Sequence, residues 1–159
     1  MKRSIWPAFA LALAAMGPVA CSPAEEATSG DPAAPEGLSV SNARLLLPPV
    51  AGNPAAVYFD LDNAGARDVT LRAASVQGAE SAMIHEMSTW NNQPNMNEVM
   101  QIGVPAGKVL KFEPAGLHVM ANNLADAVVA GGTAEVTLTF AGGDKLSFPA
   151  EVRAAGDDR

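Results

Sequence analysis

Apolar and polar residues alternate in short runs along most of the chain, and turn-forming residues separate the runs. The clearest case is Val136, Leu138 and Phe140, which alternate with Thr137 and Thr139. This period of two is typical of a strand that buries one face. Comparable runs predict strands at 40–47, 56–61, 69–73, 82–87, 109–112, 117–120, 134–140 and 145–152.

Turn signals connect these runs at distances that favour antiparallel pairing. The run at 69–73 follows Asn63-Ala64-Gly65 at hairpin distance, and Gly142-Gly143-Asp144 predicts a tight hairpin between the last two strands. Residues 124–129 allow one helical turn at most, because the stretch is too short for a stable helix. Seven or eight short strands at this spacing predict an all-β fold, either an antiparallel β-sandwich or a small Greek-key barrel.

The N-terminus has the pattern of a secretion signal. Lys2 and Arg3 precede an apolar run at 5–16, which is shorter than the about 20 residues that a membrane helix needs. Small residues then lead to Cys21, the single cysteine of the chain. Val19-Ala20-Cys21 resembles the end of a bacterial lipoprotein signal, in which the cysteine is acylated and becomes the mature N-terminus. The alternative is cleavage after Ala20, which would leave a soluble protein.

We therefore expect four segments along the chain. Residues 1–20 are a signal peptide, and lipidated Cys21 starts a tether at 21–37 that is too rich in Pro, Ala, Ser and acidic residues to bury a core. Residues 38–153 form the folded domain, and 154–159 form a tail. The predicted location is the periplasm, as a lipoprotein anchored to a membrane, and Ser22 after the cysteine favours the outer membrane.

The charge balance excludes one class of partner. Removing Lys2 and Arg3 with the signal leaves 17 acidic and 8 basic residues, a net charge of −9. Nucleic-acid binding depends on Lys and Arg contacts to phosphate, so we expect no nucleic-acid partner.

The candidate chemistry centres on two histidines, the only ones in the chain. Each is followed two residues later by methionine, in His85-Glu86-Met87 and His118-Val119-Met120. Residues two apart in a strand project from the same face, so each pair presents an imidazole beside a thioether. A single such pair is more often a packed histidine beside a core methionine. Two pairs that together hold every histidine favour a metal site instead.

Ligand softness indicates which metal. Thioether sulfur is a soft neutral donor that suits Cu(I) and offers little to Zn(II), Ca(II) or Mg(II). Imidazole binds Cu(I), Cu(II) and Zn(II) alike, so Cu(II) remains a second possibility through the histidines. The predicted domain lacks the cysteine thiolate of blue-copper electron carriers and has no further histidine for hydrolysis, so we expect no enzyme.

Three other methionines have different settings. Met96 and Met100 lie in or beside a polar stretch at 91–98, which predicts an exposed loop. Each of these methionines is then either a metal ligand or an exposed residue without a role. Met83 precedes Ile84, and we expect Met83 in the core.

At these residues the chain resembles the periplasmic PCu(A)C-type copper chaperones. Their signature is His, ten residues, Met, twenty-one residues, His, one residue, Met, and His85, Met96, His118 and Met120 satisfy every spacing. The resemblance extends over about 56–140.

The resemblance implies a cupredoxin-like β-sandwich that holds one Cu(I) through these four residues. It also implies delivery of that copper to the dinuclear centre of cytochrome c oxidase or to an assembly protein of the oxidase. Met87 and Met100 are auxiliary candidates that could replace Met96. We expect a monomer. Two alternatives remain: a copper buffer for tolerance, which shares the site, and a lipid-tethered adhesion or scaffold sandwich, which leaves the paired motifs unexplained.

Overall fold

The computed structural model describes residues 34–157, and within them it consists of strands, turns and loops. No helix in this part of the chain is long and apolar enough to cross a membrane. The predicted signal, Cys21 and most of the predicted tether lie outside the described residues. The described strands are β1 (Leu38–Leu46), β2 (Ala55–Asn63), β3 (Val69–Val76), β4 (Ala79–Trp90), β5 (Gln93–Glu98), β6 (Ile102–Val104), β7 (Lys108–Phe112), β8 (Leu117–Leu124), β9 (Thr133–Phe140) and β10 (Lys145–Arg153).

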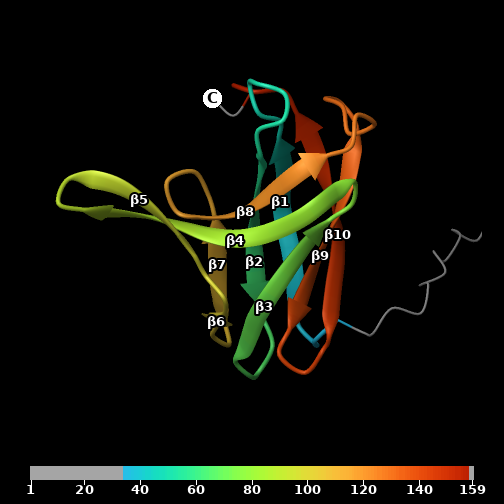
Figure 1. Ribbon diagram of the computed structural model, residues 1–159. Coiled ribbons are helices and arrows are strands. Elements are labelled where there is room, and N and C mark those ends of the chain that lie inside the picture. Colours follow the sequence, from blue (N-terminus) through green and yellow to red (C-terminus); the bar gives the residue numbers. More distant parts are fainter. Residues whose placement is uncertain (1–33, 158–159) are drawn as a thin grey trace, which may run out of the picture.

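The strands form one rolled sheet in the order β5-β4-β8-β7-β2-β1-β10-β9-β3-β6, and β8 also pairs with β2. Most neighbours are antiparallel, but β1 runs parallel to β10, and β7 meets β8 in a parallel bridge. The sheet folds over so that β3 lies close to β4 and β6 lies close to β7 (Figure 1). The predicted all-β, cupredoxin-like sandwich is confirmed.

The core is built by strict alternation, which is the reason these residues form strands. In β2, Val57, Phe59 and Leu61 are buried, and the residues between them are only half-buried. Phe59 stacks on Phe112 of β7 with ring centroids 4.1 Å apart. All eight predicted runs overlap a strand, and the hairpin at 142–144 joins β9 to β10 as expected.

The predicted hairpin between 56–61 and 69–73 is wrong. Among its described pairings β3 bonds to β6 and β9, so the chain crosses from one layer to the other after β2. Asn63 provides the physical reason, because its buried side-chain Nδ2 donates to the carbonyl oxygens of Arg67 and Val104, each at 2.9 Å. These bonds hold the connecting loop against the end of β6, away from β2's own ladder.

The polar stretch at 91–98 is not a loop either. Its residues from Gln93 onward form β5, which pairs with β4 along six positions and is exposed throughout. Asn91 and Asn92 make the turn with φ of 49° and 58°, the left-handed conformation that two-residue hairpins favour and that asparagine tolerates. The β4–β5 hairpin projects from the sandwich (Figure 1). The segment 124–129 contains no helix and turns at Ala125–Val128.

Candidate metal centre

The two histidines lie directly opposite each other on neighbouring strands. His85 of β4 pairs with His118 of β8, and their rings are nearly parallel, 24° between planes, with centroids 5.9 Å apart. An ion between two imidazoles, each with a nitrogen–metal distance of about 2.0 Å, requires ring centroids about 6 Å apart or somewhat less. The observed separation fits this requirement.

The hydrogen bonds of the two rings also suit metal binding. His118 is 5% exposed, and its Nδ1 lies 3.1 Å from the Gly116 carbonyl oxygen. With Nδ1 donating there, Nε2 keeps its lone pair for a ligand role, the arrangement common to metal-binding histidines. The Nδ1 of His85 is buried without a hydrogen-bond partner. A buried polar atom of this kind is costly unless something binds it, and a metal ion would satisfy it.

The thioethers lie on the same face of the sheet as the imidazoles. Residues directly opposite each other in a ladder share a face, and so do residues two apart. Met120 of β8 lies opposite Met83, and Met96 of β5 lies opposite Met87. The four predicted ligands therefore share one face of the β5–β4–β8 sheet, with Met120 half-buried and Met96 45% exposed.

Met83 corrects one expectation from the sequence. It is not a core residue: it is 36% exposed, and it shares the face of His85 while its neighbour Ile84 points into the core. The period-two series Met83, His85, Met87 was the signal that could have revealed it. Of the auxiliary candidates, Met87 lies on the ligand face, whereas Met100 is 74% exposed in the segment between β5 and β6.

Carboxylates and other hard metal ligands are few on the face of the β5–β4–β8 sheet that carries the histidines. Within residues 34–157, three or more His, Cys, Asp or Glu side chains nowhere gather closely enough to hold a metal ion. Glu98 is the acidic residue in register with His85. Methionine sulfurs are therefore the main further side-chain donors beside the two histidines on this face.

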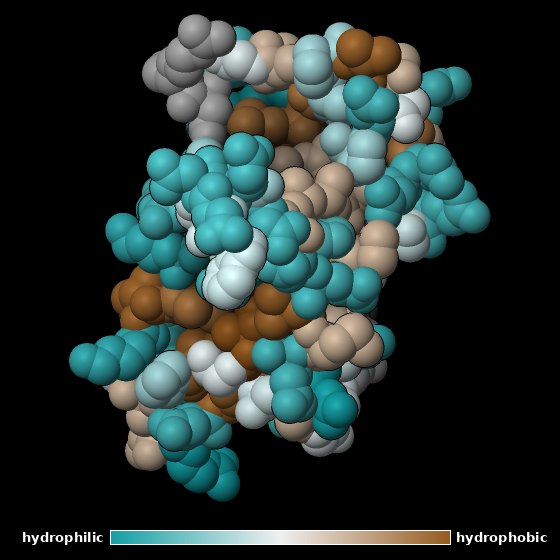
Figure 2. All heavy atoms as spheres, turned by 60° about the vertical axis from the view of Figure 1, so that its left-hand side comes forward, coloured by the Kyte–Doolittle hydropathy of each residue, from teal (hydrophilic) through white to brown (hydrophobic). Residues whose placement is uncertain are grey.

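Aromatic packing from β2 borders the histidines. The Tyr58 ring lies 6.3 Å from the His118 ring at a tilt of 48°, and the Arg44 guanidinium lies over Tyr58 at 5.1 Å from its centroid. Tyr58 therefore borders His118 on the β2 side, away from β4, whereas Met96 on the other side remains exposed. Figure 2, with the hairpin side turned forward, shows mostly hydrophilic residues over that side and a hydrophobic band beneath.

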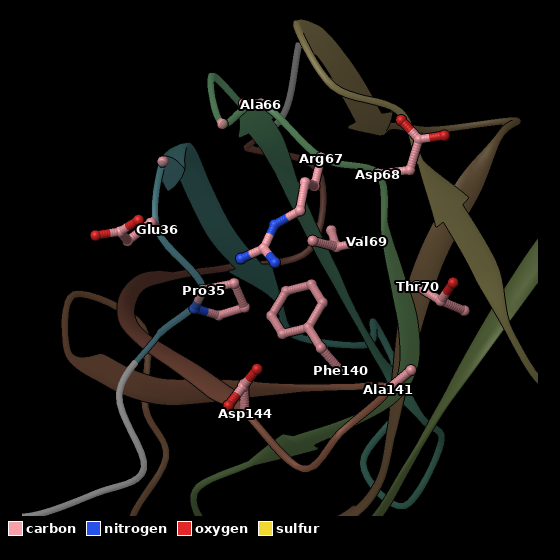
Figure 3. A pocket seen from close by; sticks show the side chains of 12 residues that line it. Pro35, Glu36, Ala66, Arg67, Asp68, Val69, Thr70, Phe140, Ala141 and Asp144 are labelled. Carbon is pink, nitrogen blue, oxygen red and sulfur yellow. The ribbon is translucent and has the colours of Figure 1, made fainter.

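A separate pocket of about 620 Å³ lies elsewhere, between the start of β3, the 35–37 segment and the β9–β10 turn. Arg67 extends over it toward Phe140, and Asp144 lies at its other side (Figure 3). None of its lining residues belongs to β4, β5 or β8, so the pocket and the candidate metal centre are distinct.

A family described as "Putative lipoprotein LpqE-like" matches residues 38–152, which is most of the chain. The chain belongs to the LpqE-like family. A relative from Leifsonia xyli subsp. xyli (strain CTCB07), "Putative lipoprotein Lxx21020", is 31% identical over 122 residues, covering 76% of this chain and 71% of the relative.

Solved structures share the fold of this LpqE-like chain. The copper-bound PCuAC domain from PmoF2 is 20% identical with a TM-score of 0.61, covering 74% of this chain and 93% of that domain. The solution structure of CuI-DR1885 from Deinococcus radiodurans is 26% identical with a TM-score of 0.61, covering 79% and 84%. The resemblance to the PCu(A)C-type family is confirmed.

Proposed function

We propose that this LpqE-like protein binds one Cu(I) through His85, His118, Met96 and Met120 and carries it to a recipient protein. The observation that carries the proposal is the facing histidine pair, in which the buried Nδ1 of His85 has no partner, flanked by thioethers on the same sheet face. Two imidazoles supply affinity, and soft sulfur supplies the preference for Cu(I) over Zn(II).

Two relatives support this assignment. CuI-DR1885, at 26% identity, is a Cu(I)-bound protein, and the PmoF2 domain of the same fold is copper-bound. The donors of this chain match such cargo, because no thiolate or carboxylate cluster competes within the described residues.

The burial pattern favours a carrier over a structural metal site or an enzyme. The core consists of apolar residues from nine strands, and of the four ligands only His118 is buried. The scaffold therefore has a core without the metal, and the exposed edge of the site allows a recipient's ligand to approach the ion. Such exposure suits transfer, whereas catalysis favours a site closed from water.

The test is a competition titration with a Cu(I) chelator under reducing conditions. The wild-type domain should bind one Cu(I) tightly and Zn(II) far more weakly. The double variant Met96→Leu/Met120→Leu keeps apolar side chains of similar volume and should lose Cu(I) affinity by at least about tenfold while staying folded. Unchanged affinity in this variant would remove the thioethers from the site.

For the recipient and location we propose the copper-centre assembly of a respiratory oxidase, reached from a lipid anchor at Cys21 on the periplasmic side of a membrane. The lipoprotein descriptions of the family and of the Leifsonia relative support the anchor. Mixing Cu(I)-loaded protein with the apo copper domain of an oxidase should move the metal to that domain. Copper retained on this protein would instead indicate a buffer that serves tolerance.

A further inference from the structure

The ligand face contains a compact group that the four-residue signature does not describe. His85 lies opposite His118, and two positions along both strands Met83 lies opposite Met120. In an antiparallel ladder these four Cα atoms mark a rectangle of about 5 by 7 Å. Two imidazoles and two thioethers therefore lie on adjacent rungs of the β4–β8 ladder.

Met96 has a different position relative to Met120. It lies across β4 on β5, opposite Met87, so His85 separates it from Met120 along β4. In an untwisted sheet the Cα atoms of Met96 and Met120 would lie about 17 Å apart. Two methionines that bind one ion, each with a sulfur–metal distance of about 2.3 Å, reach across no more than about 13 Å between Cα atoms. Joint binding therefore depends on how far the β4–β5 hairpin bends toward β8.

The hairpin is the least secured part of this face. β5 is an edge strand that pairs with β4 alone, and all six of its residues are exposed. Met83 instead lies in the middle of β4, at a position of the ladder that pairs β4 with β8. Edge elements with few buried contacts open more readily than interior strands.

We propose that Met83 is a further thioether ligand of the Cu(I) site, so that His85, His118, Met120 and Met83 retain the ion when Met96 is withdrawn. This inference rests on the proposed function. Met96 is then the exchangeable ligand: its sulfur leaves the ion, the sulfur of Met83 takes the open position, and copper remains Cu(I) until a recipient's donors replace these ligands. Met83 keeps the ion on the β4–β8 ladder during that exchange.

The test compares two methionines placed symmetrically about His85. Met83 and Met87 lie on the same strand and face, each two residues from His85, but of the two only Met83 lies opposite a thioether of β8. In a Met96→Leu background, Met83→Leu should lower Cu(I) affinity by about tenfold or more, as expected for a direct ligand, and by clearly more than Met87→Leu does. Thermal unfolding of each apo variant verifies that the fold is kept. Equal effects, or a larger effect of Met87→Leu, would overturn the role of Met83.

A second readout uses the unmutated protein. Methionine methyl NMR should show the Met83 signal shift on addition of one Cu(I), and by more than the signal of Met100, which is 74% exposed between β5 and β6. A Met83 methyl that stays in place while the Met120 methyl shifts would contradict the inference and leave the copper carrier intact. A wild-type protein without any Cu(I) binding would defeat the proposed function itself.

Discussion

Replacing Ile84 by alanine should destabilise the domain and leave copper binding intact. Ile84 of β4 is 3% exposed and lies opposite fully buried Val119. This pair faces the core, whereas the adjacent pairs along the same ladder carry the metal ligands on the opposite face of the sheet. The change removes three buried carbon groups, worth about 2.4 kcal/mol at about 0.8 kcal/mol each. With the cavity that remains, the expected loss is about 3 kcal/mol.

In a domain of this size that loss should lower the apo melting temperature by roughly 10–18 °C. Cu(I) affinity, measured well below the new melting temperature, should stay within about threefold because the ligand side chains project from the opposite face. Met120→Leu is the matched control on the ligand face. Because it conserves side-chain volume, the free energy of unfolding should change by less than about 1.5 kcal/mol while the Cu(I) affinity falls. Circular dichroism and chelator competition measure the two quantities. If Ile84→Ala kept the wild-type melting temperature, or lost more Cu(I) affinity than Met120→Leu, then Ile84 would not face the core with the ligands on the opposite face.

Three further outcomes are expected. The apo domain should give a β-sheet circular dichroism spectrum, and free Cu(I) at 100 times the dissociation constant should add about 2.7 kcal/mol by binding the native state, so an unfolded apo protein would contradict the independent scaffold. Acidification should weaken Cu(I) binding because protons compete for the imidazole nitrogens, and a flat affinity from neutral to acidic pH would argue against histidine ligands. Cys21→Ser should abolish fatty-acid labelling and membrane association, whereas an unlabelled wild type would exclude the lipid anchor.

The alternation of apolar and polar residues was enough to predict most strands of the sheet from the sequence. Val136, Leu138 and Phe140 are buried as their period of two required, and the Gly142-Gly143-Asp144 turn joins their strand to β10. The sequence could not show that β3 leaves the ladder of β2, because that choice depends on the side chain of Asn63 reaching the Val104 carbonyl, 41 residues away.

The sequence predicted the placement of the two histidines more closely than the placement of the methionines. The His-x-Met spacing placed each histidine on the same face as its own methionine, and the register of β4 with β8 brings His85 and His118 together. The sequence did not predict β5, because Gln93–Glu98 has no alternation of apolar and polar residues. Its strand conformation comes from pairing with β4 after the Asn91-Asn92 turn. Met83 was misassigned because its neighbour Ile84 is a core residue, although adjacent strand positions point to opposite faces.

X-ray absorption at the copper edge of the Cu(I)-loaded protein tests the central claim most directly, because it reports the atoms bound to the metal. We predict a copper shell that contains both imidazole nitrogen and thioether sulfur, and loss of sulfur scattering when the methionines of the ligand face are replaced by leucine. A shell of nitrogen and oxygen alone in the wild-type protein would contradict a site built from histidine and methionine.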